Sequence, residues 1–298
     1  MRNVTRPFGR TLTAMITPFT RSGELDADGS AELARYLVDE QGCDGLVLNG
    51  TTGESPTTTD AEKIQLIETV VDAVGDRAHI LAGTSNYNTR HSVEQAKSAE
   101  KAGANGLLLV TPFYSLPPQD GIAAHFTAIA DATELPVMLY DIPGRSGMGI
   151  ALDTYGELVK HPRVIAVKDA THNLAFSQYV RNRTGITVYC GVDPLNLAAY
   201  STGAVGVVSV IGHLFGRHIN AMFDAYDQGE VEKALAISDA LQPALEALQG
   251  GVQGVIAVKA ALALKGLPGG EPRLPLTPAD DAIVDLIKNN LAEVEEIL

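Results

Sequence analysis

The sequence predicts a (β/α)8 barrel followed by a C-terminal helical extension, and three observations support this prediction. Short runs rich in Val, Ile and Leu alternate with longer amphipathic segments. Successive runs are about thirty residues apart, as in a unit of two parallel strands joined by a helix. Eight such runs occur, and no further strand pattern follows Val210. Eight strand–helix units are the number that closes a barrel of this type.

The predicted strands are short and apolar, which is typical of parallel strands buried on both faces. They are LTAMITP from Leu12, GLVLNG from Gly45, HILAGT from His79, GLLLVTP from Gly106, PVMLYDIP from Pro136, VIAVKDA from Val164, TVYCGV from Thr187 and AVGVVSV from Ala204. A doubly wound open sheet is the alternative, but the first run is not followed by the G-x-G-x-x-G turn that would favour it.

Helical patterns fill the gaps between the strands. Three of them cover residues 30–42, 59–75 and 89–103. The second opens with a capping box formed by Thr59 and Glu62 and ends at Gly75. Three or four further helices are expected after the last strand. We therefore divide the chain into a catalytic barrel, residues 1–212, and a C-terminal helical extension, residues 213–298.

The composition limits the partners and the location that can be expected. The formal net charge is −14, so the surface repels phosphate backbones and nucleic acid is not an expected partner. No apolar stretch approaches the ~20 residues that span a bilayer, and the N-terminal segment MRNVTRPFGRTLTAMITPF lacks the apolar core of a signal peptide. Cys43 and Cys190 form no metal or redox motif and are expected to be core thiols. We expect a cytoplasmic protein without membrane contact.

The pentapeptide VIAVK occurs twice, and its two lysines are predicted to have different roles. Active sites in barrels lie at the carboxyl ends of the strands, and Lys168 ends the sixth strand. Burial there disfavours a charged ammonium, and a neutral amine can attack a ketone to form a Schiff base. A structural ion pair with Asp169 or another carboxylate is the alternative. Lys259 lies in VQGVIAVKAALALKG, a helical pattern, and is expected to be half-buried with a snorkelling or paired ammonium.

Polar side chains end several other strands, and together they predict a site for a small carboxylic acid. NGTTGES follows the second strand, and the hydroxyls and N–H groups of Thr51 and Thr52 can hold a carboxylate. VTPFYSLPP carries Tyr114, and LYDIPGRSG carries Tyr140 and Arg145. A tyrosine beside a lysine can relay protons, and an arginine can bind a carboxylate through two hydrogen bonds. Each motif alone is also typical of a turn or a core tyrosine, but their convergence on one barrel face favours a site.

Several common kinds of site are not indicated. The seven histidines show no H-E-x-x-H or similar spacing, so no metal is expected. No P-loop or nucleophile elbow is present. The turn SVIGHLFG after the last strand has too little Gly to predict a phosphate site. A carboxylate substrate and no cofactor are therefore expected.

In this order and spacing, NGTTGES, VTPFYSLPPQDG, LYDIPGRSG and VIAVKDA resemble the motifs of the dihydrodipicolinate synthase and N-acetylneuraminate lyase family of pyruvate-dependent class I aldolases. The resemblance covers essentially the whole chain. Arg145 resembles the arginine with which the synthase branch binds the carboxylate of aspartate semialdehyde. The resemblance thus implies condensation of pyruvate with aspartate semialdehyde, in lysine and diaminopimelate biosynthesis. It also implies a homo-oligomer, namely a tetramer built as a dimer of dimers.

The resemblance further implies a role for each matching residue. Lys168 would form the imine with pyruvate, and Tyr140 would relay protons to and from it. Thr52 would link the hydroxyls of Tyr140 and Tyr114, and Tyr114 would reach in from a neighbouring subunit. The substrate-binding residues implied are Thr51, Thr52, Arg145 and the backbone near Gly191 and Val208.

Two departures from the family pattern leave alternatives open. Val192 stands where the synthases usually have an acid, and Phe113 stands where Tyr is usual. Another pyruvate aldolase, acting on a sugar acid or another aldehyde, is the alternative within the family. A non-catalytic pyruvate-binding or structural oligomer is the alternative of a different class.

A third departure concerns regulation. Lysine-inhibited members of the family bind lysine in a polar pocket at the dimer interface that includes an Asn and a Glu. Tyr87 and His91 stand at the matching positions here, and Lys63 and Asp60 are also altered. Weak or absent inhibition by free lysine is therefore expected.

Overall fold

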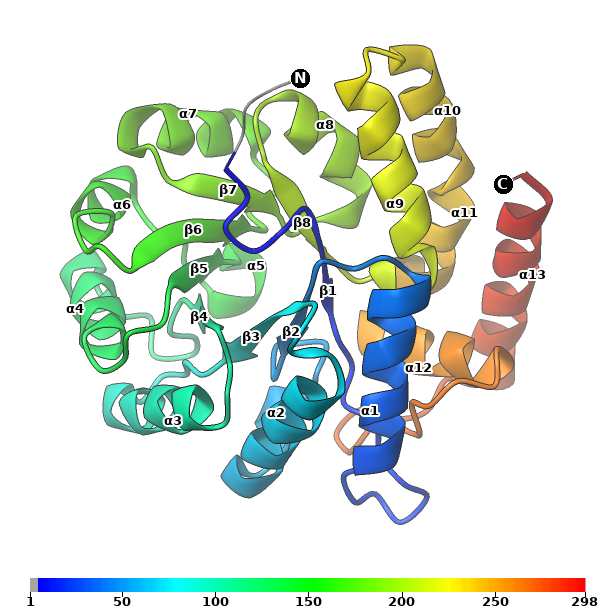
Figure 1. The fold of residues 1–298 in the computed structure, drawn as a ribbon, viewed down its shortest axis with the longest axis horizontal. Coiled ribbons are helices and arrows are strands. Elements are labelled where there is room, and N and C mark those ends of the chain that lie inside the picture. The colour runs from blue at the N-terminus through cyan, green and yellow to red at the C-terminus, as the bar shows by residue number, and fades with distance from the viewer. Residues whose placement is uncertain (1–4, 298) are drawn as a thin grey trace.

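Residues 5–297 are described by the computed structural model, and within them eight parallel strands close into a barrel in chain order (Figure 1). The strands are β1 Thr11–Ala14, β2 Gly45–Leu48, β3 His79–Gly83, β4 Gly106–Val110, β5 Val137–Asp141, β6 Val164–Asp169, β7 Thr187–Cys190 and β8 Gly206–Ser209. All eight predicted strands and the barrel are confirmed, and an open sheet is excluded because β8 pairs with β1. Residues 1–4, with which the N-terminal segment discussed above begins, and residue 298 lie outside the described residues.

The strand register determines which side chains meet at the carboxyl ends. Tyr140 of β5 lies opposite Lys168 of β6, and Lys168 lies opposite Tyr189 of β7. The strands are buried along nearly their whole length, which is why their sequences read as continuous apolar runs. Because all strands run in the same direction, the residues that end them gather at one end of the barrel.

Helices surround the barrel (Figure 1). They are α1 Ala27–Arg35, α2 Asp60–Val74, α3 Thr89–Lys101, α4 Gln119–Ala130, α5 Pro143–Ser146, α6 Leu152–Leu158, α7 Leu174–Thr184, α8 Asn196–Ser201, α9 Gly212–Asp227, α10 Val231–Ala240, α11 Gln242–Leu245, α12 Gly254–Leu264 and α13 Asp281–Ile297. Residues 36–40 and 246–250 form π-helical turns, and residues 55–57 and 193–195 form 3-10 turns.

Side-chain caps explain where the predicted helices begin. In α2 the predicted capping box is present, because Oγ1 of Thr59 accepts from the Glu62 N–H and the Glu62 carboxylate accepts from the Thr59 N–H. Helix α1 begins earlier than its sequence pattern indicates, since Asp26 caps it by accepting from the Gly29 N–H at 2.9 Å. Asn88 caps α3 in the same way.

The C-terminal helices lie together on one side of the barrel, next to α1 and β1 (Figure 1). In the described part of the chain, four helices of at least ten residues follow β8, namely α9, α10, α12 and α13, together with the single turn α11. Helix α9 packs against β1. Within residues 5–297 no single helix is long and apolar enough to cross a membrane, and the one pair of segments that reaches that length, 242–250 with 254–264, is bent by 116°.

The two copies of VIAVK adopt different structures, as predicted. The first forms most of β6, and the second lies within α12. The pairing expected for the Lys259 ammonium is confirmed, but the half-buried position predicted for it was wrong. Its side chain is 2% exposed and pairs with the equally buried Glu54, so its ammonium does not reach solvent. The helical pattern could not show this, because Glu54 is brought to α12 by the barrel and not by a local contact.

Candidate active site

Lys168 lies at the carboxyl end of β6 with its side chain inside the barrel mouth. The residue is 6% exposed, and its Nζ lies 4.3 Å from the centre of the Tyr140 ring. The Lys168 amine therefore lies over the ring face of Tyr140 in a largely buried position. Lys168 and Tyr140 are thus brought together as the sequence predicts.

Gly191 makes room for this lysine. A Cβ atom at position 191 would lie 2.9 Å from Cγ and from Cε of Lys168. Real Cβ atoms essentially never come this close to another side chain. The Gly191 N–H donates to the carbonyl of Asp169 at 2.8 Å and fixes the turn after β7 against β6. The structure therefore places Gly191 directly against the candidate reactive amine.

A cleft of about 540 Å³ opens at the same end of the barrel. Thr51, Tyr140 and Arg145 line it. Arg145 belongs to the short helix α5, is exposed, and has no carboxylate within ion-pairing distance in residues 5–297. Its guanidinium is therefore free to bind a carboxylate that enters the cleft. Thr52 lies beside Thr51 and is buried.

The loop after β2 that carries both threonines is tightly folded. Asn49 (φ 55°) and Glu54 (φ 53°) have left-handed backbone conformations, which residues other than glycine rarely adopt. Oγ1 of Thr17, at the end of β1, donates to the carbonyl of Gly53 at 2.6 Å. These contacts hold the loop across the barrel mouth and direct Thr51 into the cleft.

Asp193 joins the loop after β7 to the loop after β8. Its buried Oδ2 accepts hydrogen bonds from the backbone N–H groups of Val210 at 2.8 Å and Ile211 at 3.0 Å. Val208 lies just before these amides on β8 and is 2% exposed. The backbone segments that contain Gly191 and Val208 are thus held side by side.

Tyr114 does not line the cleft of its own protomer. Its side chain is 92% exposed, on a loop where Tyr114 (φ 71°) and Leu116 (φ 48°) both have positive φ angles. Leu116 and Tyr87 are also exposed, and the Tyr87 ring packs edge-to-face on Phe113 at 5.4 Å. Large apolar side chains are therefore presented to solvent beside the cleft.

Asp141, next to Tyr140 on β5, is a buried carboxyl group that contacts Tyr155 of α6 and does not line the cleft. It is fully buried, and burial raises its pKa to about 6. Hydrogen bonds from the Tyr155 hydroxyl (2.9 Å) and the Ile150 N–H favour the charged form and oppose the shift, while the charge of Asp169 adds to it. Asp141 therefore titrates nearer to neutrality than an exposed aspartate does.

Sequence reasoning assigned no role to Glu54, Asp193 or Asp141, although all three lie in segments that end predicted strands. All three are buried acids whose partners come from other elements. Glu54 lies within the NGTTGES motif itself, and its position between small and hydroxyl residues could have marked it. Asp141 is the last residue of β5 and Asp193 lies three residues after β7, and neither carries a comparable signal.

The fold and the site together define a class of protein, a (β/α)8 barrel organised around a buried lysine at the end of its sixth strand. Comparison with known proteins is more specific. The chain matches the Dihydrodipicolinate synthetase family over residues 7–294, and it belongs to this family.

Individual relatives agree over nearly the full length. The chain is 53% identical over 286 residues to 4-hydroxy-tetrahydrodipicolinate synthase 2 of Streptomyces coelicolor, covering 96% of this chain and 95% of the relative. It is 54% identical to the 4-hydroxy-tetrahydrodipicolinate synthase of Acidothermus cellulolyticus, covering 96% and 92%. Among solved structures, the lysine-bound enzyme from Cyanidioschyzon merolae superposes with a TM-score of 0.94 at 38% identity, covering 98% of this chain and 99% of that one.

Proposed function

We propose that this protein is a lyase that condenses pyruvate with L-aspartate 4-semialdehyde to 4-hydroxy-tetrahydrodipicolinate, in lysine and diaminopimelate biosynthesis. The observation that carries the proposal is the buried Lys168 beside Tyr140, below a cleft that also presents Thr51 and Arg145. Family membership and relatives that carry the name of this synthase support it.

The reaction begins with an imine. The neutral amine of Lys168 attacks the ketone carbon of pyruvate, and loss of water gives a C=N bond. The imine withdraws electrons, so a methyl proton leaves and an enamine forms. The enamine carbon adds to the aldehyde carbon of the second substrate, which takes up a proton on its oxygen. The amino group of the adduct then attacks the imine carbon, closes the ring and releases Lys168.

Each of these steps needs a proton moved near the imine, and Tyr140 is the residue whose ring Lys168 contacts. We assign proton relay to Tyr140, with Thr52 linking its hydroxyl to that of Tyr114. Thr51 and Thr52 hold the pyruvate carboxylate, and the backbone near Gly191 and Val208 completes that subsite. No step requires a metal or another cofactor.

The aldehyde substrate carries a carboxylate. Arg145 and Lys63 both line the cleft, but the Lys63 ammonium already donates to the carbonyl of Thr58 at 2.6 Å, so Arg145 is the better placed cation. A guanidinium binds a carboxylate through two parallel hydrogen bonds, which orients the aldehyde toward the enamine. The alternative within the family, an aldolase for a sugar acid or another aldehyde, is favoured only by the apolar, buried Val192 after Gly191.

The proposed assembly is a homo-oligomer in which Tyr114 completes the site of a neighbouring subunit, arranged as a tetramer built from two dimers. The high exposure of Tyr114 and of its apolar neighbour Leu116 supports this part of the proposal. The proposal also includes a cytoplasmic location. It divides the chain into a catalytic barrel, residues 1–212, and a C-terminal extension, residues 213–298. The free, buried Cys43 and Cys190 suit a reducing compartment.

Borohydride reduction in the presence of pyruvate tests the proposal. We expect a stable adduct whose added mass maps to Lys168, followed by turnover with aspartate semialdehyde in a coupled assay. Absence of an adduct, or an adduct on Lys259, would overturn the mechanism and favour a non-catalytic binding protein. An adduct on Lys168 with preferred turnover of another aldehyde would support the second aldolase.

A further inference from the structure

Lys259 of α12 forms a fully buried ion pair with Glu54 in the loop after β2. Nζ lies 2.7 Å from Oε1 of Glu54, and the two side chains are 2% and 1% exposed. Within residues 5–297 this Oε1 has no hydrogen-bond partner beyond the ion pair. Nζ also donates to the carbonyl of Glu271 at 3.2 Å and lies 4.1 Å from the centre of the Phe19 ring. The Lys259 side chain is thus fixed in the interior, and its ammonium neutralises the charge of the Glu54 carboxylate.

Glu54 is part of the turn that presents the threonines. It follows Thr52 by two residues, and its backbone is left-handed, with φ 53° and ψ 37°. Its N–H donates to the carbonyl of Thr51 at 3.2 Å, and its carbonyl accepts from the Thr57 N–H at 2.9 Å. A non-glycine residue keeps such a conformation only where surrounding contacts hold it. The position of the Glu54 side chain therefore determines the shape of the Thr51–Thr52 turn.

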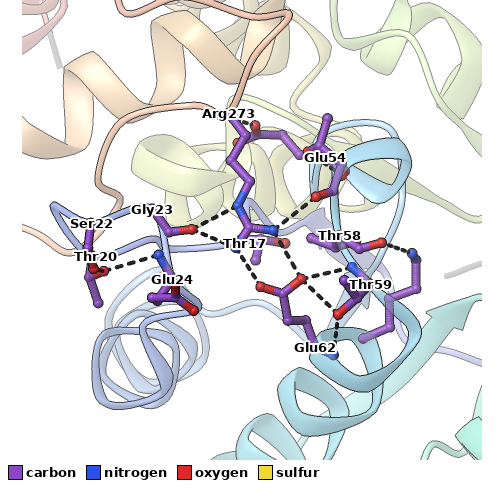
Figure 2. Close-up of polar contacts among 12 residues, drawn as sticks. Thr17, Thr20, Ser22, Gly23, Glu24, Glu54, Thr58, Thr59, Glu62 and Arg273 are labelled. Atoms are coloured by element: carbon purple, nitrogen blue, oxygen red, sulfur yellow. Dashed lines mark hydrogen bonds and ion pairs between the residues drawn. The ribbon is translucent and has the colours of Figure 1, made fainter.

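Arg273 provides a second contact from the same C-terminal segment. Its backbone N–H donates to Oε2 of Glu54 at 2.8 Å. Its guanidinium lies between the carbonyl of Gly23 and the carboxylate of Glu62 (Figure 2). The guanidinium also donates to the carbonyl of Thr57 at 2.9 Å. Both oxygens of Glu54 are thus bound from the chain beyond residue 258, which the barrel itself does not include.

We propose that Lys259 is a positioning residue for substrate binding: from outside the barrel, it holds the Glu54 carboxylate and thereby the Thr51–Thr52 turn that receives the pyruvate carboxylate. This inference rests on the proposed function. Removing Lys259 leaves a buried carboxylate unpaired, which is strongly unfavourable. The loop can relieve this only by moving Glu54 toward water, and the two threonines move with it. Arg145 and Lys168 lie on other elements and keep their places.

The test is Lys259→Met, which keeps the length of the side chain and removes its charge. The KM for pyruvate, and the pyruvate concentration needed for half-maximal borohydride trapping, should rise about tenfold to a hundredfold. The KM for the aldehyde should stay within about twofold, because Arg145 is unaffected. Lys265→Met is the matched control, since Lys265 belongs to the same extension but its ion pair with Glu295 is exposed. It should leave both KM values unchanged.

A purely structural role would lower the melting temperature or the fraction of active enzyme without changing the KM for pyruvate, and that result would overturn the inference. If Lys259→Met does not fold, the double variant Glu54→Gln with Lys259→Met carries the test, because it removes the pair without leaving a lone charge. A wild-type KM for pyruvate in the folded double variant would equally overturn the inference. Absence of a Lys168 adduct in the unaltered protein would overturn the proposed function itself, so the two failures are distinguishable.

Discussion

Gly191 and Lys168 are in direct contact at the end of the barrel, with no space for a methyl group between them: a Cβ atom at position 191 would lie 2.9 Å from Cγ and Cε of the lysine. Gly191→Ala should therefore displace the amine from Tyr140. We expect kcat/KM and the rate of borohydride trapping to fall about a hundredfold, as is typical of a misplacement near 1 Å. Gly156→Ala is the control, since its Cβ would meet nothing within 4 Å. Trapping of Gly191→Ala at the wild-type rate would contradict the assignment of Lys168.

Arg145→Ala should selectively weaken the binding of the aldehyde substrate. Loss of a charge-assisted contact is worth about 1.5–3 kcal/mol, so the KM for aspartate semialdehyde should rise at least about tenfold. The KM for pyruvate should not change, because the proposed mechanism assigns its carboxylate to Thr51 and Thr52. Steady-state kinetics with each substrate varied in turn measures both values. An equal rise in the two KM values would mean that Arg145 supports the cleft in general rather than one substrate.

Asp141 should make the free energy of unfolding of this protein depend on pH. Its pKa is about 6 in the folded protein and 3.8 in a model peptide, so the folded state binds the proton more tightly. Its stabilising contribution is therefore complete below pH 3.8 and is lost as the pH rises through 6. Asp141→Asn keeps an acceptor for Tyr155 and cannot ionise. Relative to wild type, the variant should gain about 3 kcal/mol in unfolding free energy across this range.

Denaturant unfolding at several pH values measures this difference. Asp153→Asn is the control, because Asp153 is exposed on α6 and its replacement should give the same pH profile as the wild type. A constant difference between Asp141→Asn and the wild type at all pH values would show that Asp141 does not titrate in this window.

Free lysine should inhibit turnover less than about twofold at millimolar concentration. Tyr87, His91, Lys63 and Asp60 all line the cleft. The Asp60 carboxylate is already bound by Nε2 of His91 at 2.8 Å, and the Lys63 ammonium repels a second cation. The double variant Tyr87→Asn with His91→Glu should gain sensitivity to lysine, since it restores the residues typical of inhibited relatives. Strong inhibition of the unaltered enzyme would contradict this expectation.

Tyr114 can be tested by mixing two inactive variants. If Tyr114 serves a neighbouring subunit, a dimer of one Lys168→Ala and one Tyr114→Phe protomer contains one site with both residues intact. Denaturing and refolding the two variants together should therefore restore about a quarter of the wild-type activity, because half of the dimers are mixed. Each variant refolded alone is the control. Absence of recovery in a mixture that forms dimers would place Tyr114 in its own protomer's site.

The sequence by itself determined the barrel, its eight strands and the residues at their ends. It could do so because a strand buried on both faces must be apolar throughout, and because parallel strands bring their ends together. For the same reason the sequence alone groups Lys168, Tyr140, Thr51 and Arg145 at one end of the barrel. The helix that contains Lys259 was equally predictable, since its Ala and Leu pattern is local.

Only the tertiary structure decided what these residues contact. Glu54 and Lys259 are 205 positions apart by their numbers, and no local pattern reports that they form a buried ion pair. Likewise, the need for glycine at position 191 depends on a lysine from the neighbouring strand. The periodicity of a sequence predicts which side chains are buried, because burial follows the repeat of the helix or strand. Which residue a buried side chain contacts depends instead on how elements distant in the sequence pack together.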